Sequence, residues 1–119
     1  MGLSLKTEFE YIPKFNGNDE SKSPAVFKIM AMGAIEFRAW ADELRKAAGD
    51  GELTPAARKV YADLVRGHVV VIKGMDIDGV AIPDGAALVE NPGVPNALLT
   101  EIERAILDGS NLSKDEAKN

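Results

Sequence analysis

The amino-acid sequence predicts a small α+β domain, because its hydrophobic pattern changes between that of strands and that of helices. Residues 3–12 alternate between apolar and polar, which is typical of a half-buried strand. Residues 33–66 instead repeat their apolar positions every three or four residues, which is typical of amphipathic helices. Strand patterns return after residue 68, and a last helical pattern starts near residue 95. We therefore expect β-hairpins packed against a helical hairpin and a C-terminal helix.

Composition limits the classes to which this protein can belong. The chain has 119 residues, of which 45% are hydrophobic and 28% charged, which suits one globular domain. It has no cysteine, so disulfides, thiolate metal sites and a cysteine nucleophile are excluded. The net charge of −5 disfavours phosphate backbones and anionic lipids as partners. Neither a signal peptide nor an apolar run of about 20 residues is visible, so we expect a cytoplasmic protein without nucleic-acid or membrane partners.

The first predicted strand is followed by a polar loop. Within 3–12, the apolar and aromatic side chains share one face, while Glu8 and Glu10 point away from it. Pro13 ends the strand, and turn-forming residues fill the loop over 14–24. The strand is therefore expected to bury one face and expose the other.

Three further strand signals follow along the chain. The nearly continuous apolar run over 25–32 predicts a strand covered on both faces, and its distance from the first strand permits an antiparallel hairpin. The β-branched run over 69–72 predicts another buried strand. Asp78-Gly79, between alternating apolar residues, predicts a tight hairpin turn because both positions tolerate a positive φ.

The helical hairpin over 33–66 has clear start and stop signals. Gly49 is the expected end of its first helix, and Thr54 with Pro55 is the expected start of the second. Trp40 lies on the apolar stripe of the first helix. We predict that it belongs to the core rather than to a binding site.

The C-terminal half predicts one short and one long helix. Asp84 is expected to cap a short helix that runs through Glu90. The long helix is expected to begin near Pro95 and to end at Gly109 or Ser110. Three of its charged residues are predicted to form a solvated face: Glu101, Glu103 and Arg104.

The end of the chain is predicted to lie outside the packed domain. A capping pattern begins at Ser113, but little apolar sequence follows it. No internal repeat or linker divides the rest of the chain. We therefore expect a single α+β domain over 1–112 and a frayed C-terminal tail over 113–119.

The sequence contains no set of residues with the spacing of a catalytic or metal site. His68, the single histidine, is predicted to pack its ring or to bind a backbone carbonyl at a helix end. Asp76 and Asp78 match the first positions of a calcium loop, but the later ligands are missing and a hairpin explains both residues. No phosphate-binding loop occurs. We therefore predict a protein that is not an enzyme and that uses no cofactor or metal.

The candidate protein-binding residues cluster around Pro13. Aromatic side chains beside a flexible loop can anchor a partner, but they can equally close the end of a small core. The N-terminal strand can also be a sheet edge that pairs with another chain. The candidates are Tyr11, Ile12 and Phe15.

Two stretches carry a resemblance to a known family. Residues 9–18, which read FEYIPKFNGN, resemble the opening of small proteins encoded among tailed-bacteriophage tail genes. Residues 68–119 combine the β-branched run, the Asp-Gly turn, the LTEI segment at 99–102 and the closing SNLS and EAKN segments. This stretch is similar to phage tail assembly chaperones, and together the two stretches cover about half of the chain.

The resemblance implies a non-enzymatic protein that keeps the long tape measure protein soluble while tail tube subunits assemble. It carries over no functional residue, and it is compatible with a homo-oligomer. The alternative is a small structural tail or head–tail connector component, which would be present in the finished virion. An acidic mimic of DNA is disfavoured, because the 19 acidic residues are interspersed with 14 basic ones.

Overall fold

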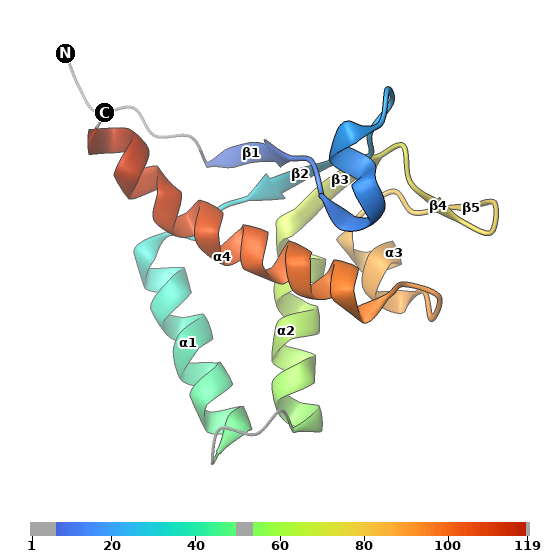
Figure 1. Ribbon diagram of the computed structural model, residues 1–119. Helices are drawn as coiled ribbons and strands as arrows, with labels where there is room; N and C mark the ends of the chain where they lie inside the picture. The colour runs from blue at the N-terminus through green and yellow to red at the C-terminus, as the bar shows by residue number, and fades with distance from the viewer. Residues whose placement is uncertain (1–6, 50–53, 119) are drawn as a thin grey trace.

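The computed structural model describes residues 7–49 and 54–118, and the side chains within these ranges as far as position 109. A three-stranded antiparallel sheet with the order β1-β2-β3 forms one layer, and helices cover one of its faces (Figure 1). The predicted α+β class is confirmed. The three strands are β1 (Glu8–Tyr11), β2 (Val26–Met30) and β3 (Val69–Lys73).

β1 and β2 form the antiparallel hairpin that the loop length permitted. Phe9 and Tyr11 are half-buried whereas Glu8 and Glu10 are exposed, so the predicted alternation is confirmed where the structure describes it. The beginning of the predicted strand, 3–6, lies outside the described residues.

The prediction that β2 is covered on both faces is wrong. Phe27 and Ile29 are buried, but Lys28 and Met30 are exposed, because the helices pack on one face only. β3 differs from its prediction for a related reason: the register with β2 shifts by one residue, which leaves Val70 as the extra residue of a β-bulge. Its side chain is 38% exposed within a run that the sequence predicted to be buried.

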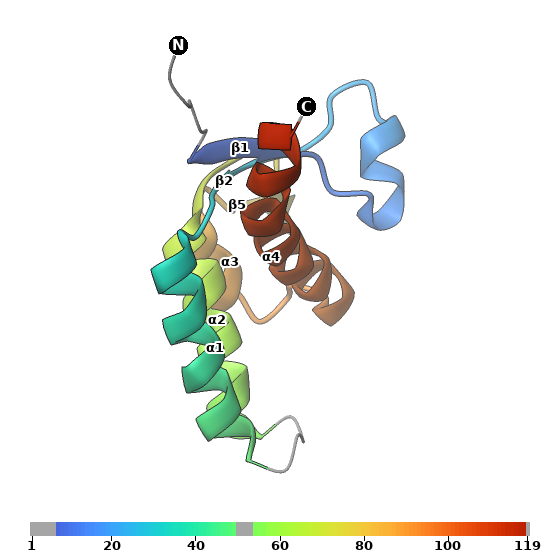
Figure 2. The same cartoon turned by 90° about the vertical axis from the view of Figure 1, so that its left-hand side faces the viewer.

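The helical hairpin consists of α1 (Ala34–Ala48) and α2 (Pro55–His68). Gly49 ends α1 at a φ of 59°, and the Thr54 hydroxyl accepts a hydrogen bond of 3.0 Å from the backbone N–H of Ala57, so both predicted signals are confirmed. Figures 1 and 2 show this hairpin extending away from the sheet as an arm. Trp40 is half-buried between the two helices, where its ring meets that of Tyr61 edge-on at a centroid distance of 5.6 Å.

The predicted Asp-Gly hairpin forms β4 (Asp76–Ile77) and β5 (Val80–Ala81). Asp78 and Gly79 both have a positive φ, at 51° and 81°, as the turn requires. The short helix α3 (Gly85–Glu90) follows, and the carboxylate of Asp84 caps it by accepting 2.9 Å from the N–H of Ala87.

The predicted end of the last helix at Gly109 or Ser110 is wrong, because α4 runs from Asn96 to Lys118. Gly109 does not stop the helix. It lies against the ring of Phe9, and a Cβ at this position would overlap three of the ring carbons. The side chains of 110–119 lie outside the described residues, so the frayed tail remains a prediction.

The core lies between the sheet and the helices α2, α3 and α4. No residue of α1 is fully buried, since this helix packs chiefly against α2. The sheet and the three core helices therefore form the body of the domain, and α1 is attached to its side. The largest fully buried side chains are Phe27, Ile29, Leu64, Val65, Ile82, Leu88, Ile102 and Ile106.

Candidate functional sites

The carboxylate of Glu101 on α4 holds the end of β1 and the loop that follows. It accepts hydrogen bonds from the hydroxyl of Tyr11 at 2.6 Å, from the N–H of Lys14 at 2.6 Å and from the N–H of Phe15 at 3.0 Å. The last two donors lie at the start of η1 (Phe15–Glu20), a 3-10 helix within the predicted polar loop. Burial raises the pKa of the Tyr11 hydroxyl, and its hydrogen bond to the Glu101 carboxylate raises it further.

The prediction for Glu101 is therefore corrected. Glu101 is not part of a solvated helix face: it is half-buried and pairs with three donors. The side chain of Asn18 bridges the two ends of the loop that was predicted to be flexible. Its amide group donates to the carbonyl of Pro13 at 2.8 Å and accepts from the N–H of Ala25 at 2.8 Å.

The three candidate binding residues have different surroundings. Tyr11 and Phe15 are half-buried and pack against the core, as in the interpretation that they close one end of it. Ile12, between them, is 42% exposed. Of the three, Ile12 therefore presents the most accessible apolar side chain.

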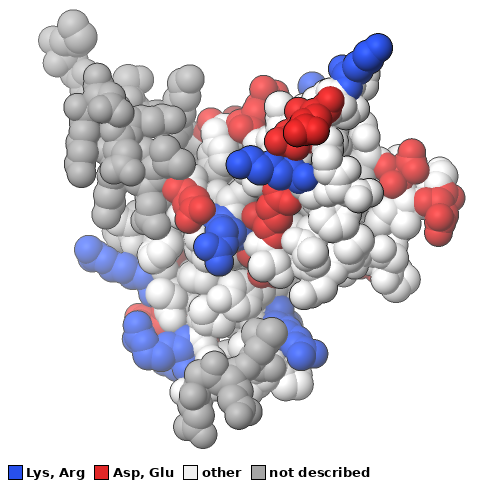
Figure 3. All heavy atoms as spheres, in the orientation of Figure 1, with Lys and Arg blue, Asp and Glu red and all other residues white. Residues whose placement is uncertain are grey.

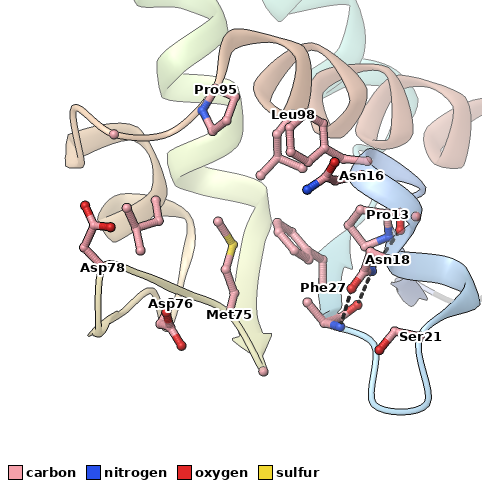
Figure 4. A pocket seen from close by; sticks show the side chains of 16 residues that line it. Pro13, Asn16, Asn18, Ser21, Phe27, Met75, Asp76, Asp78, Pro95 and Leu98 are labelled. Carbon is pink, nitrogen blue, oxygen red and sulfur yellow. Dashed lines mark hydrogen bonds between the residues drawn. The ribbon is translucent and has the colours of Figure 1, made fainter.

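A groove of about 620 Å³ lies between η1 and the β4–β5 hairpin. Figure 4 shows Phe27, Met75 and Leu98 at its floor, with Asp76 and Asp78 on the hairpin side. Phe15 and several turn residues of the loop form the opposite wall. The groove is thus lined by both apolar side chains and polar turn residues.

A second groove, of about 640 Å³, runs between α2 and α4, and we call it the helical groove. Glu103 lies in it and is half-buried, so its assignment to a solvated face is also corrected. Burial raises the pKa of its carboxyl group. A signal for this existed in the sequence, since Glu103 lies one helical turn after the apolar Leu99. The groove is lined by Arg58, Tyr61, Ala62, Val65, Val89, Asn96, Leu99, Thr100 and Glu103.

His68 lies where a structural histidine was predicted. Its Nδ1 is 2.8 Å from the carbonyl of Leu64, one turn earlier on α2, and its Nε2 is 3.1 Å from the carboxylate of Glu36 on α1. When Nδ1–H donates to this carbonyl, Nε2 is the ring nitrogen that faces the Glu36 carboxylate. The histidine therefore links the two helices of the arm.

Three structural features bear on metal, nucleic-acid and membrane binding. Within 7–49 and 54–109 no three His, Asp or Glu side chains come together as a metal-binding group. Figure 3 shows basic and acidic side chains interspersed over one face, with no continuous basic surface in that view. No helix in the described part of the chain is long and apolar enough to span a membrane.

No protein family model, curated protein or solved structure matches this chain.

Proposed function

We propose that this protein acts by binding another protein, as a phage tail assembly chaperone that holds the tape measure protein before the tail tube forms. The resemblance of residues 9–18 and 68–119 to that family supports the proposal. The structural observation that carries it is the helical groove, which lies between α2 and α4 and has Val65, Val89 and Leu99 among its lining residues.

The helical groove suits the apolar stripe of an amphipathic helix. Side chains that project from one face of a helix at every third or fourth position can lie between α2 and α4, over Val65, Val89 and Leu99. A long helical protein exposes such stripes before its assembly partners arrive, and exposed stripes promote aggregation. Covering them with a small acidic domain keeps the complex soluble.

The charges at the groove favour one kind of helix. Glu103 is half-buried and takes part in none of the ion pairs formed among the described side chains. A lysine or arginine beside the apolar stripe of the partner helix would neutralise this carboxylate as the groove closes over it. The proposed partner therefore carries a basic residue next to its apolar stripe.

The test is co-expression with the tape measure protein encoded by the same phage. Thr100→Trp should block the helical groove, because Thr100 lines it with an exposed side chain whose replacement removes nothing from the core. Ala97→Trp, at an exposed position of the same helix outside the groove, is the matched control. We expect wild type and the control to keep the tape measure protein soluble and to co-elute with it, and the Thr100 variant to do neither.

Two results would count against the chaperone. If the tape measure protein is equally insoluble with and without this chain, and no complex survives size-exclusion chromatography, the proposal fails. If the chain is instead present at a fixed copy number in purified virions, the structural tail or connector component takes its place.

A further inference from the structure

The outer edge of β1 presents backbone groups that pair with no described strand. β1 is the first strand in the sheet order, and both ribbon views show no described strand beyond it (Figures 1 and 2). The carbonyl of Thr7 accepts a hydrogen bond of 2.7 Å from the N–H of Ala31. This bond defines which residues of β1 point their backbone N–H and C=O groups toward β2 and which point them outward. Phe9 and Tyr11 therefore direct their backbone groups toward β2, and Glu8 and Glu10 direct theirs outward.

The side chains at this edge limit what can pair with it. Glu8 and Glu10 lie on the outer, exposed face of the sheet, and Phe9 and Tyr11 lie on the inner face. A strand added here places alternate residues directly opposite the two glutamates, where opposite charges attract and like charges repel. Lys28 lies opposite Glu10 in the strand register, and its Nζ is 3.9 Å from the Glu8 carboxylate, so this cation approaches the two glutamates from the β2 side.

A second copy of the chain is a poor occupant. When the described strand, Glu8–Tyr11, pairs antiparallel with the same strand of a second copy through the outward backbone groups, Glu8 or Glu10 faces a glutamate of the other copy. Shifting that register by one residue removes the hydrogen bonds, because the outward groups no longer meet. The two glutamates therefore protect the edge from self-association, as charged residues on exposed edges commonly do.

We propose that the outer edge of β1 binds an extended segment of a partner protein with basic side chains at alternating positions. The N–H and C=O groups of Glu8 and Glu10 pair with the segment's backbone, and their carboxylates face its lysines or arginines. The residues between the basic ones are apolar and lie on the inner face beside Phe9 and Tyr11. This surface is distinct from the helical groove, so the inference does not depend on the function proposed above.

The surroundings of the edge have the same sign of charge. Asp19 on η1 and Asp108 on α4 both act on the Tyr11 hydroxyl, where their negative charge adds to the rise in its pKa. These two carboxylates act on the inner face of the sheet, whereas the segment's basic side chains face Glu8 and Glu10 on the outer face.

The probe is a short acetylated peptide of alternating lysine and valine, tested against the intact protein by hydrogen exchange and by titration calorimetry. We expect the peptide to slow exchange of the Glu8 and Glu10 amides, which face outward, and to leave those of Phe9 and Tyr11 little changed. A peptide of the same composition with its lysines and valines in separate blocks should bind at least several-fold more weakly, since only alternation matches the strand.

Charge reversal separates this proposal from a general attraction of cations to an acidic protein. The double variant Glu8→Lys, Glu10→Lys should bind the lysine–valine peptide about tenfold more weakly, because two attractive charge pairs become repulsive. The same variant should gain affinity for a glutamate–valine peptide, which a folding defect cannot produce. Glu43→Lys with Glu90→Lys changes the net charge equally at exposed sites on α1 and α3, and should weaken binding much less.

Three outcomes would overturn the proposal. The first is that both double variants weaken binding of the lysine–valine peptide equally. The second is that the peptide protects only amides outside β1. The third is that the charge-reversed variant does not gain affinity for the glutamate–valine peptide. Formation of a wild-type dimer through β1, seen as protection of Glu8 and Glu10 that grows with protein concentration alone, would assign the edge to a second copy instead.

Discussion

Replacing Gly109 by alanine tests the contact between α4 and β1. In most helices this change stabilises by about 0.5–1 kcal/mol, because alanine has the higher helix propensity. Here the new Cβ would overlap the ring of Phe9, which packs against the core and cannot move outward without losing that contact. Overpacking of this kind costs about 1–3 kcal/mol, so we expect a net loss on the order of 1–2 kcal/mol.

Gly67→Ala is the matched control, because Gly67 lies inside α2 and a Cβ there would have no neighbour within 4 Å. For a chain of this length, 1 kcal/mol corresponds to a shift of roughly 4 °C in Tm. We therefore expect Gly109→Ala to lower Tm by about 4–8 °C and Gly67→Ala to raise it by a few degrees, as measured by far-UV circular dichroism. In a Phe9→Leu background the cost of Gly109→Ala should largely disappear. A rise in Tm for Gly109→Ala in the wild-type background would refute the packing of Phe9 against α4.

Three further predictions concern a turn and two ionisable groups. Gly79→Val should destabilise the domain by about 1–3 kcal/mol, since a β-branched residue resists a positive φ, and an unchanged thermal midpoint would contradict this. The raised pKa of Tyr11 means that its stabilising contribution is present below the usual tyrosine pKa of about 10 and is lost as pH rises above it; Tyr11→Phe should flatten this alkaline loss in pH-dependent melts. The pKa of Glu103 is also raised by folding, so ionisation of its carboxyl group at neutral pH lowers the stability of the fold. Glu103→Gln should raise Tm at pH 7, and the gain should vanish in acid, where both side chains are neutral; a gain independent of pH would show another cause.

The sequence correctly predicted the turns and helix ends that depend only on neighbouring residues. The Asp-Gly turn, the end of α1 at Gly49 and the Thr54 cap each depend on one or two neighbouring residues, and the structure contains all three. Hydrophobic period likewise predicted the strands and helices, because burial of one face imposes that period.

The errors arose where the cause lies far along the chain. Glu101 was assigned to solvent because its partners, Tyr11 and the start of η1, are about 90 residues away in the sequence. Gly109 was interpreted as a helix stop for the same reason, since its neighbour Phe9 comes from the opposite end of the chain. Continuous apolar runs predicted strands buried on both faces, but a run does not reveal that helices cover one face alone.

The predicted binding residues show the same contrast between local features, which the sequence reveals, and tertiary contacts, which it does not. Tyr11, Ile12 and Phe15 all lie within a few residues of Pro13, so the sequence alone indicates that they are neighbours. It did not reveal that two of them pack against the core, nor that the helical groove forms from α2 and α4. Grooves between elements depend on tertiary packing, so no local pattern predicts them.

The arm formed by α1 and α2 has a consequence for how this domain opens. α1 contributes no fully buried side chain, and its Trp40 buries an Nε1 that has no hydrogen-bond partner among the described residues, which reduces the free energy gained by its docking. α1 should therefore detach in sub-global openings that leave the sheet and α4 folded, and its amides should exchange before those of α2. Because Trp40 is the only tryptophan, intrinsic fluorescence reports on this detachment rather than on loss of the core. Fluorescence and circular dichroism melts of this protein should then fail to superimpose, with the fluorescence transition at the lower temperature.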